Sequence, residues 1–183
     1  MLGERADPLP LPALAARAQL GDSAALEELL RRLQQPLADH VRALIRDDGA
    51  AEDVLQDALL IVARKLGTVR EVQWVRAWAY RVATREALRA LRRSHREHTE
   101  PLDDASLAAS PVPEDSGVDH ELLAALPTKL AAVPFGAQIM LRMHYLQGLS
   151  QQEVAEALEM PIGTVKSRIA YGLQCLRKAD WRQ

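Results

Sequence analysis

Residues 149–168 read LSQQEVAEALEMPIGTVKSR, which is two short helical patterns separated by a tight turn. Ser150 and Glu153 have the spacing of a capping box, in which two amides at a helix start are satisfied reciprocally. Val154 and Leu158, four residues apart, are expected to face inward. Pro161 suits the first turn of the next helix, where no backbone donor is missed. That second helix carries one apolar stripe, made of Ile162, Val165, Ile169, Leu173 and Leu176. The order of these signals predicts a DNA-binding helix-turn-helix.

The face opposite this stripe is polar and has a cation at each edge. At about 100° per residue, the residues on that face are Thr164, Ser167, Tyr171 and Gln174. Lys166 and Arg168 flank them. A helix in the major groove has base edges beneath it and phosphates on both walls, which this arrangement matches. The alternative is an ordinary amphipathic helix with a solvated outer face.

Composition favours helices throughout. Leu and Ala dominate the 183 residues, only one Phe is present, and no segment shows the alternation typical of a strand. We expect an all-α protein of two small helical domains joined by a flexible acidic linker, the second a four-helix domain with the helix-turn-helix. The single cysteine, Cys175, excludes a disulfide framework and a cysteine-based zinc site. It is expected to be a small packed or half-buried residue.

The net charge of −2 hides a strong segregation of charge along the chain. The balance is −5 over residues 1–63, +8 over 64–96, −8 over 97–121 and +3 over 122–183. Such asymmetry indicates separate surfaces for separate partners. Neither a signal peptide nor a membrane span is visible in the sequence, and a cytoplasmic, nucleoid-associated protein without membrane insertion is expected.

The −8 segment also marks a boundary, because it contains three prolines and little apolar periodicity. We expect a linker at residues 97–120 between domains at residues 11–96 and 121–178. The linker is either a disordered, solubilising tether or a segment whose negative charge occupies a channel built for nucleic acid.

The first domain begins with a leucine stripe, and Pro36 is predicted to kink or split its helix. Gly49 is predicted to end that unit. The next helix, near residues 51–66, has a wide apolar face and an acidic start, made of Glu52, Asp53, Gln56 and Asp57. Acidic residues in a first helical turn are favoured by the helix dipole, so capping alone explains Glu52 and Asp53. Gln56 and Asp57 share a face with Asp53, so the functional interpretation is an acidic patch for a basic partner.

A longer helix is predicted near residues 72–95. Its arginines recur every three or four residues and form one stripe, made of Arg81, Arg85, Arg89, Arg92 and Arg96. Like charges at this spacing repel unless an anion binds them. Trp74, Trp78 and Tyr80 lie just ahead of the stripe or at its start. Arginines beside aromatic rings are typical of a path for single-stranded nucleic acid. Trp78 fits an ordinary core position better, whereas Trp74 is equally compatible with either role.

Three motifs in order resemble a known family. Residues 51–57, AEDVLQD, resemble the polymerase-clamp motif of bacterial RNA polymerase sigma factors of the extracytoplasmic-function type. Residues 76–83, RAWAYRVA, resemble the promoter-melting helix of that family, and residues 148–168 resemble its second DNA-binding domain. The resemblance extends from about Leu11 to Arg177.

The resemblance implies a transcription initiation factor that binds core RNA polymerase and promoter DNA. By position, Glu52, Asp53, Gln56 and Asp57 would contact the polymerase clamp. The loop at residues 67–73 and the arginine stripe would hold the melted minus-ten strand, with Trp74 beside them. The residues implied at the duplex minus-thirty-five element are Ser150, Thr164, Lys166, Ser167, Arg168 and Tyr171. An anti-sigma protein is a further partner that the resemblance implies.

Several positions depart from the family pattern: Ala50, Arg85, Arg89, Gln138, Glu159 and Tyr171. Glu159 stands at a turn position where glycine is usual, which implies strain or a variant turn. A free-standing dimeric helix-turn-helix regulator is the alternative function, although it leaves the arginine stripe unexplained. The five histidines form no ligand or triad arrangement, and no glycine-rich phosphate loop occurs. We therefore expect no enzyme, no catalytic residue, no metal and no cofactor.

Overall fold

The computed structural model describes residues 9–97, 126 and 128–180. Every regular element in these ranges is helical, as the composition predicted. The chain divides into two compact units, residues 1–88 and 89–183, and the division falls within the longest helix. The predicted linker at residues 97–120 lies almost entirely outside the described residues, and the predicted domain limits stay predictions.

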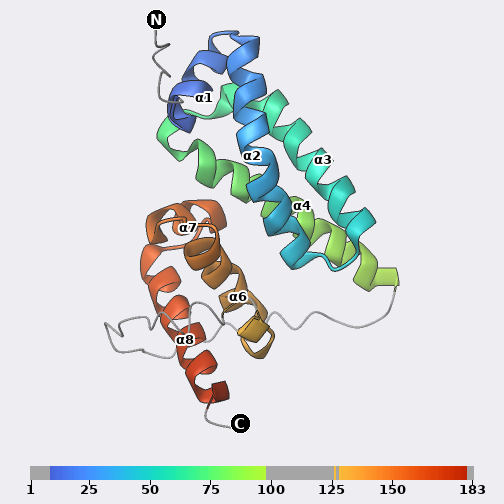
Figure 1. Cartoon of the computed structure of the whole chain (residues 1–183), viewed down its shortest axis with the longest axis vertical. Helices are drawn as coiled ribbons and strands as arrows, with labels where there is room; N and C mark the ends of the chain where they lie inside the picture. Colours follow the sequence, from blue (N-terminus) through green and yellow to red (C-terminus); the bar gives the residue numbers. More distant parts are fainter. Residues whose placement is uncertain (1–8, 98–125, 127, 181–183) are drawn as a thin grey trace, which may run out of the picture. The chain divides into compact units, whose positions relative to one another are not determined.

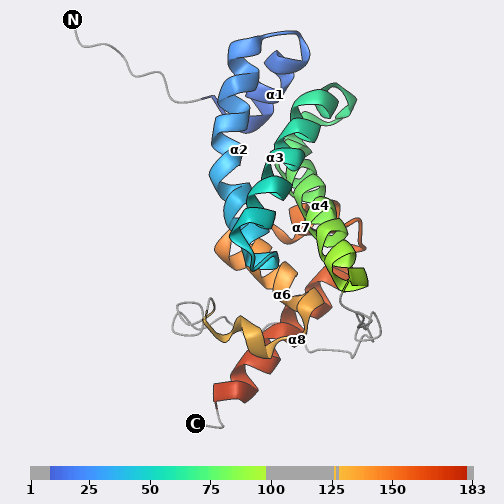
Figure 2. The same ribbon diagram turned by 90° about the vertical axis from the view of Figure 1, so that its right-hand side faces the viewer.

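The first unit is built from four helices and two short 3₁₀ turns. Their bounds are α1 Leu11–Gln19, α2 Ser23–Leu44, α3 Asp48–Lys65, η1 Leu66–Thr68, η2 Val72–Trp74 and α4 Val75–Glu97. Helix α2 packs against both α1 and α3, as both views of the ribbon show (Figures 1 and 2). The buried face of α2 has a leucine or valine every four residues, at Leu29, Leu33, Leu37 and Val41. Burying one such side chain contributes about 1.5–3 kcal/mol.

Helix α2 continues through Pro36, so of the two predicted outcomes, a kink or a split, the split is wrong. Pro36 is exposed, while Leu33 and Leu37 on either side of it are buried. The proline removes one backbone donor. Because it lies on the solvent side, water can satisfy the carbonyl that loses its partner, and the buried face holds the helix together.

A buried polar contact joins α2 to α4. His40 is fully buried, and its Nε2 lies 2.8 Å from Oγ1 of Thr84. The Thr84 hydroxyl donates to the carbonyl of Tyr80 at 2.8 Å, so His40 Nε2–H is the donor to Thr84. The rings of His40 and Tyr80 meet edge to face, with centroids 5.2 Å apart.

Helix α3 begins earlier than predicted. Asp47 is its N-cap, since Oδ1 of Asp47 accepts from the Ala50 amide at 2.7 Å. Asp48 occupies the first turn, where a carboxylate is favoured by the helix dipole. Gly49 therefore lies inside α3, and the prediction that it ends the preceding unit is wrong.

The second unit contains η3 Leu130–Ala132, α6 Phe135–Leu141, a π-helical turn η4 Arg142–Leu146, α7 Gln151–Leu158 and α8 Ile162–Asp180. Most of the first of the four expected helices lies outside the described residues; Leu126, Thr128 and Lys129 are helical. Helix α8 packs on both α6 and α7. Gly172 makes the contact with α6 possible, because a Cβ at this position would lie 2.7 Å from Cδ1 of Leu141.

Candidate nucleic-acid and protein interfaces

The helix-turn-helix has the predicted capping box. Oγ of Ser150 accepts from the Glu153 amide at 3.1 Å, and the Ser150 amide donates to Oε2 of Glu153 at 2.8 Å. The Pro161 carbonyl accepts from Thr164 N at 2.9 Å, so Pro161 directly precedes α8. The serine assigned to DNA binding therefore also sets the start of α7.

Of the two alternatives that the sequence left open for the turn between α7 and α8, strain or a variant turn, the structure has the strained residue in the ordinary turn. Glu159 has φ 53° and ψ 44°, the left-handed conformation that usually selects glycine. A non-glycine residue there costs about 1–2 kcal/mol. The Met160 amide bonds to the Ala155 carbonyl at 3.0 Å and closes the end of α7.

The apolar stripe of α8 is buried from Val165 onward, at Val165, Ile169, Leu173 and Leu176. The prediction that Ile162 belongs to this buried stripe is wrong, because Ile162 is 39% exposed. The first turn of α8 is open, since a Cβ added at Gly163 would meet nothing within 4 Å. Of the two residues expected to face inward in α7, Val154 is buried and Leu158 is half-buried.

The polar residues predicted on the outer face of α8 differ in how far they are exposed to solvent. Lys166 and Tyr171 are exposed, whereas Thr164, Ser167 and Arg168 are half-buried. Ser167 Oγ donates to the Thr164 carbonyl at 3.0 Å, and Nη1 of Arg168 donates to Sδ of Met160 at 3.6 Å. Arg168 thus lies across the turn that precedes its own helix.

Tyr171 has a partner on the same helix. A hydrogen bond to the side chain of Cys175, one turn further on, raises the pKa of the Tyr171 phenol. Cys175 is half-buried, as expected.

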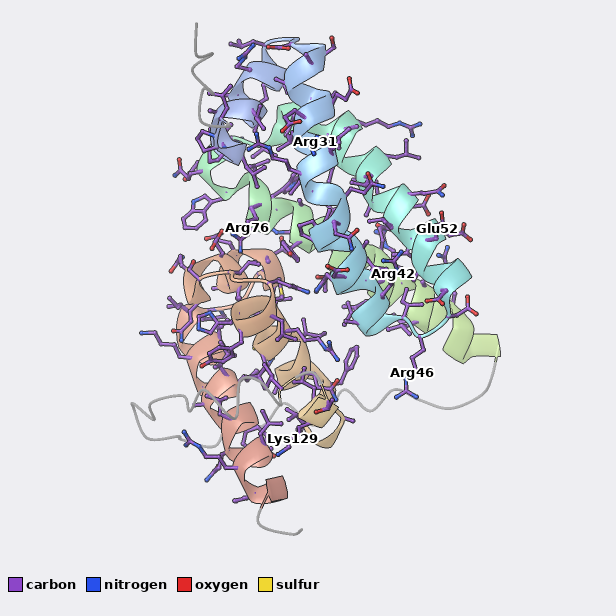
Figure 3. The ribbon with its side chains drawn as sticks, in the orientation of Figure 1. Arg31, Arg42, Arg46, Glu52, Arg76 and Lys129 are labelled. Atoms are coloured by element: carbon purple, nitrogen blue, oxygen red, sulfur yellow. The ribbon has the colours of Figure 1, made fainter. Side chains whose placement is uncertain are left out.

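The acidic patch of α3, defined as Glu52, Asp53, Gln56 and Asp57, is exposed at all four positions. Figure 3 shows Glu52 projecting from α3 away from α2. Within the described part of the chain the three carboxylates form no ion pair, in contrast to Glu28, which bonds Arg31 and Arg32. Because α3 starts at Asp48, Glu52 and Asp53 lie in its second turn, and capping alone does not explain them.

The arginine stripe lies along α4. Arg81 is half-buried, and Arg85, Arg89 and Arg92 are exposed; the Arg96 side chain lies outside the described residues. The opposite side of α4 is packed with small residues such as Ala79, Ala83 and Ala87. Trp74 ends η2, and both Trp74 and Trp78 are half-buried, so the indole of each is partly in the core and partly in water.

The loop at residues 67–73 has an anchor that sequence reasoning missed. Nε2 of Gln19 donates to the carbonyls of Leu66 at 2.9 Å and of Val69 at 2.8 Å. Gly67 and Thr68, between the two anchored carbonyls, and Arg70, just after them, are exposed. No local pattern reveals this contact, because Gln19 is 47 and 50 positions away from its acceptors.

Groups that hold metals are not visible in the described ranges, where no cluster of three or more His, Cys, Asp and Glu side chains is arranged around a common point. In the same ranges, none of the helices combines the length and apolarity needed to cross a bilayer.

The fold and these surfaces define a two-unit helical DNA-binding protein. The sequence matches the family described as Sigma-70 region 2 over residues 29–97 and the family described as Sigma-70, region 4 over residues 120–176. It is 32% identical over 150 residues to the ECF RNA polymerase sigma factor SigM of Mycobacterium tuberculosis, covering 82% of this chain and 74% of that protein. It is also 27% identical over 176 residues to the RNA polymerase sigma-H factor of Pseudomonas aeruginosa, covering 91% of each.

Two solved structures share the fold. The structure of CnrH in complex with the cytosolic domain of CnrY has a TM-score of 0.69 and 22% identity, covering 94% of this chain and 99% of CnrH. The sigma factor RpoE in complex with the anti-sigma factor NepR from Bartonella quintana has a TM-score of 0.64 and 19% identity, covering 86% of this chain and 97% of the RpoE chain. The chain belongs to the extracytoplasmic-function sigma factors. It is a transcription initiation factor that binds core RNA polymerase and recognises promoter DNA, and the regulator alternative is not favoured.

Proposed function

We propose that three separate surfaces divide the work of initiation in this chain. The acidic patch of α3 docks on the polymerase clamp, the loop at residues 67–73 and the arginine stripe hold the melted minus-ten strand, and the start of α8 reads the minus-thirty-five duplex. The observation that carries this proposal is the acidic patch: three exposed carboxylates on a rigid helix, unpaired within the described residues. Such a patch destabilises the free protein and is compensated when a basic partner binds.

The first test is run-off transcription from a genomic fragment library, with core polymerase in the presence and absence of the protein. Defined transcripts that need both components support the proposal and identify the promoters. Tight binding of the protein alone to duplex sites, without such transcripts, contradicts it and favours the dimeric regulator.

Polymerase docking is tested by charge reversal on α3. Asp53→Lys with Asp57→Lys is expected to abolish binding to core polymerase, because both substitutions place a cation against a basic surface. Glu27→Lys, at an exposed position of α2, is the matched control and is expected to bind normally. Equal binding by both variants would show that α3 is not the docking helix.

Duplex reading is tested through the salt dependence of promoter binding. Lys166→Ala is expected to lower the slope of log K against log salt concentration by about 0.9, as loss of one phosphate contact does. Lys178→Ala, an exposed position in the last turn of the same helix, is the control and is expected to leave the slope unchanged. The opposite result would move the DNA to the other end of α8.

We also infer that the chain acts by binding alone and that polymerase is the only catalyst. The chain is inferred to bind the chromosome in the cytoplasm. No RNA is expected from the protein without polymerase. An anti-sigma partner is supported by RpoE, whose structure was solved with the anti-sigma factor NepR. Isolation of the chain from cells with polymerase and no second protein would contradict such a partner.

A further inference from the structure

The side-chain amide of Gln19, at the end of α1, is committed to a single loop. Its nitrogen has two N–H donors. It donates to the Leu66 carbonyl at 2.9 Å and to the Val69 carbonyl at 2.8 Å. The Val69 amide also donates to the Leu66 carbonyl at 3.0 Å, which closes the turn from within. The turn is therefore closed by its own backbone and fixed from outside by α1.

Helix α1 is itself fastened at both ends, so Gln19 presents its donors from a fixed support. Leu14 is buried in the middle of the helix. At the C-terminal end, Nη2 of Arg17 lies 2.6 Å from Oδ2 of Asp22. At the N-terminal end, Nη1 of Arg32 donates to the Leu9 carbonyl at 2.6 Å. Helix α1 also contacts both η1 and η2, which flank the loop.

Helix α1 lies ahead of the segment that matches the Sigma-70 region 2 family, which begins at residue 29. An exposed loop loses conformational freedom when it binds a ligand, and this loss weakens binding. A loop that is already held in one conformation before binding loses less. Gln19 is placed to supply that order to the segment that exposes Thr68 and Arg70.

We propose that Gln19 is a positioning residue that holds the first part of the loop at residues 67–73 in the conformation that captures the melted promoter strand. This inference rests on the proposed role of that loop in minus-ten capture. Gln19 acts through the loop backbone and does not itself contact DNA. Its loss reduces the fraction of molecules whose loop is ready to bind, and the apparent affinity for the single strand falls by the same factor.

The experiment compares Gln19→Met, which keeps the side-chain length and removes both donors, with Gln34→Met as the control. Gln34 is exposed on α2, and its side chain has no hydrogen-bond partner among the described residues. The full chain is assembled with core polymerase, and open complexes are counted by the reactivity of unpaired thymines. We expect Gln19→Met to lower their number about threefold to thirtyfold, on duplex and on pre-melted promoters alike. Gln34→Met is expected to leave the number of open complexes unchanged, and neither variant is expected to change the affinity for core polymerase.

Hydrogen exchange in the free protein separates loop positioning from a merely structural role. In Gln19→Met the Val69 amide is expected to exchange faster, while the amides of α2 and α3 keep their protection. Loss of protection across α2 and α3 together would overturn the proposal, because Gln19 would then hold the whole unit rather than the loop.

A loop variant distinguishes failure of this inference from failure of the proposed function. Replacing residues 67–70 with Gly-Ser-Gly-Ser removes the loop side chains while Gln19 stays in place. If this variant opens promoters normally, the proposed role of the loop is wrong. If it is impaired while Gln19→Met is normal, the loop role stands and the positioning role of Gln19 is overturned.

Discussion

Gly172 offers the sharpest test of the packing in the second unit. A Cβ at this position would lie 2.7 Å from Cδ1 and 3.3 Å from Cγ of Leu141, and 3.4 Å from Cβ of Ala137. Leu141 is fully buried, so its side chain cannot move aside into solvent. Gly172→Ala therefore forces α6 and α8 apart or moves Leu141 off its rotamer, which costs about 1–3 kcal/mol.

A second effect of the same substitution has the opposite sign. Alanine in a helix interior is favoured over glycine by about 1 kcal/mol. The expected net result for Gly172→Ala is a loss of up to about 2 kcal/mol in the free energy of unfolding of this unit. For a domain of this size such a loss corresponds to a decrease in Tm of up to about 15 °C.

Gly163→Ala is the matched control in the same helix. The added methyl would meet nothing within 4 Å, so only the gain in helix propensity remains. That gain is smaller than in the helix interior, because Gly163 lies in the first turn. The difference between the two variants isolates the overpacking cost.

Hydrogen exchange of the full chain, followed at the amides of α6 and α8, measures this difference without assuming that the two units unfold together. Gly172→Ala is expected to lower protection in both helices, and Gly163→Ala to maintain or raise it. Protection in Gly172→Ala that equals or exceeds the protection in Gly163→Ala would refute the close approach of α6 and α8 at this glycine.

Four further changes have defined expected outcomes. Ser150→Ala removes the cap of α7 and is expected to cost about 1 kcal/mol, seen as faster exchange of the first α7 amides; unchanged exchange would show that the cap is not formed in solution. Glu159→Gly relieves the left-handed strain and is expected to raise the free energy of unfolding of the second unit by about 1 kcal/mol in urea titrations; a decrease would contradict the strain. Thr84→Val takes away the acceptor of the buried His40 donor and is expected to cost about 1–3 kcal/mol in the first unit, whereas a neutral result would mean that this bond contributes little. Hydrogen bonds from Arg31 and Arg32 lower the pKa of Glu28 from 4.5 to about 2. The stabilising contribution of Glu28 is therefore complete above pH 4.5 and is lost as the pH falls toward 2. Glu28→Gln is expected to remove this part of the acid dependence of Tm, and an identical acid profile in both proteins would refute the assignment.

The elements that sequence predicted best are those whose signals are local. The capping box at Ser150 and Glu153 depends on two residues three apart, and the structure has both of its hydrogen bonds. The resemblance singled out Glu159 as a turn position where glycine is usual, and of the two implications, strain or a variant turn, the structure has the strained left-handed residue. The buried stripe of α8 was predicted from its period. Ile162 is the exception, because it lies in the helix but remains exposed.

Predictions failed where two local signals competed. Asp47 and Asp48 lie beside Gly49; the glycine predicts a helix end, whereas the two acids mark a helix start. Pro36 indicates a break by its missing donor, yet packing on both sides of it maintains α2. In both cases tertiary contacts or capping outweigh a propensity of about 1–3 kcal/mol.

Other features were beyond any sequence argument. In the sequence, Gly172 is only a residue of low helix propensity. The packing of α6 against α8 shows why no side chain fits at this position. Gln19 appears as the polar last residue of a short helix, and its acceptors are carbonyls that any residue type would provide. A contact with backbone at a separation of about fifty positions leaves no trace in residue types.

In the proposed DNA surfaces of both units, the contacts that support the surface are separate from the contacts made with DNA, although Ser150 is assigned to both. Gln19 holds the loop at residues 67–73, and the capping box of Ser150 fixes the start of α7, the helix that precedes α8. Lys166, by contrast, faces outward and forms no ion pair among the described residues. A support lowers the conformational freedom of the free protein, and a charged contact acts only in the complex. Loss of a support must therefore change hydrogen exchange before DNA is added, and loss of Lys166 must change the salt dependence without changing exchange. A variant of Lys166 that altered exchange in the free protein would show that this separation does not hold.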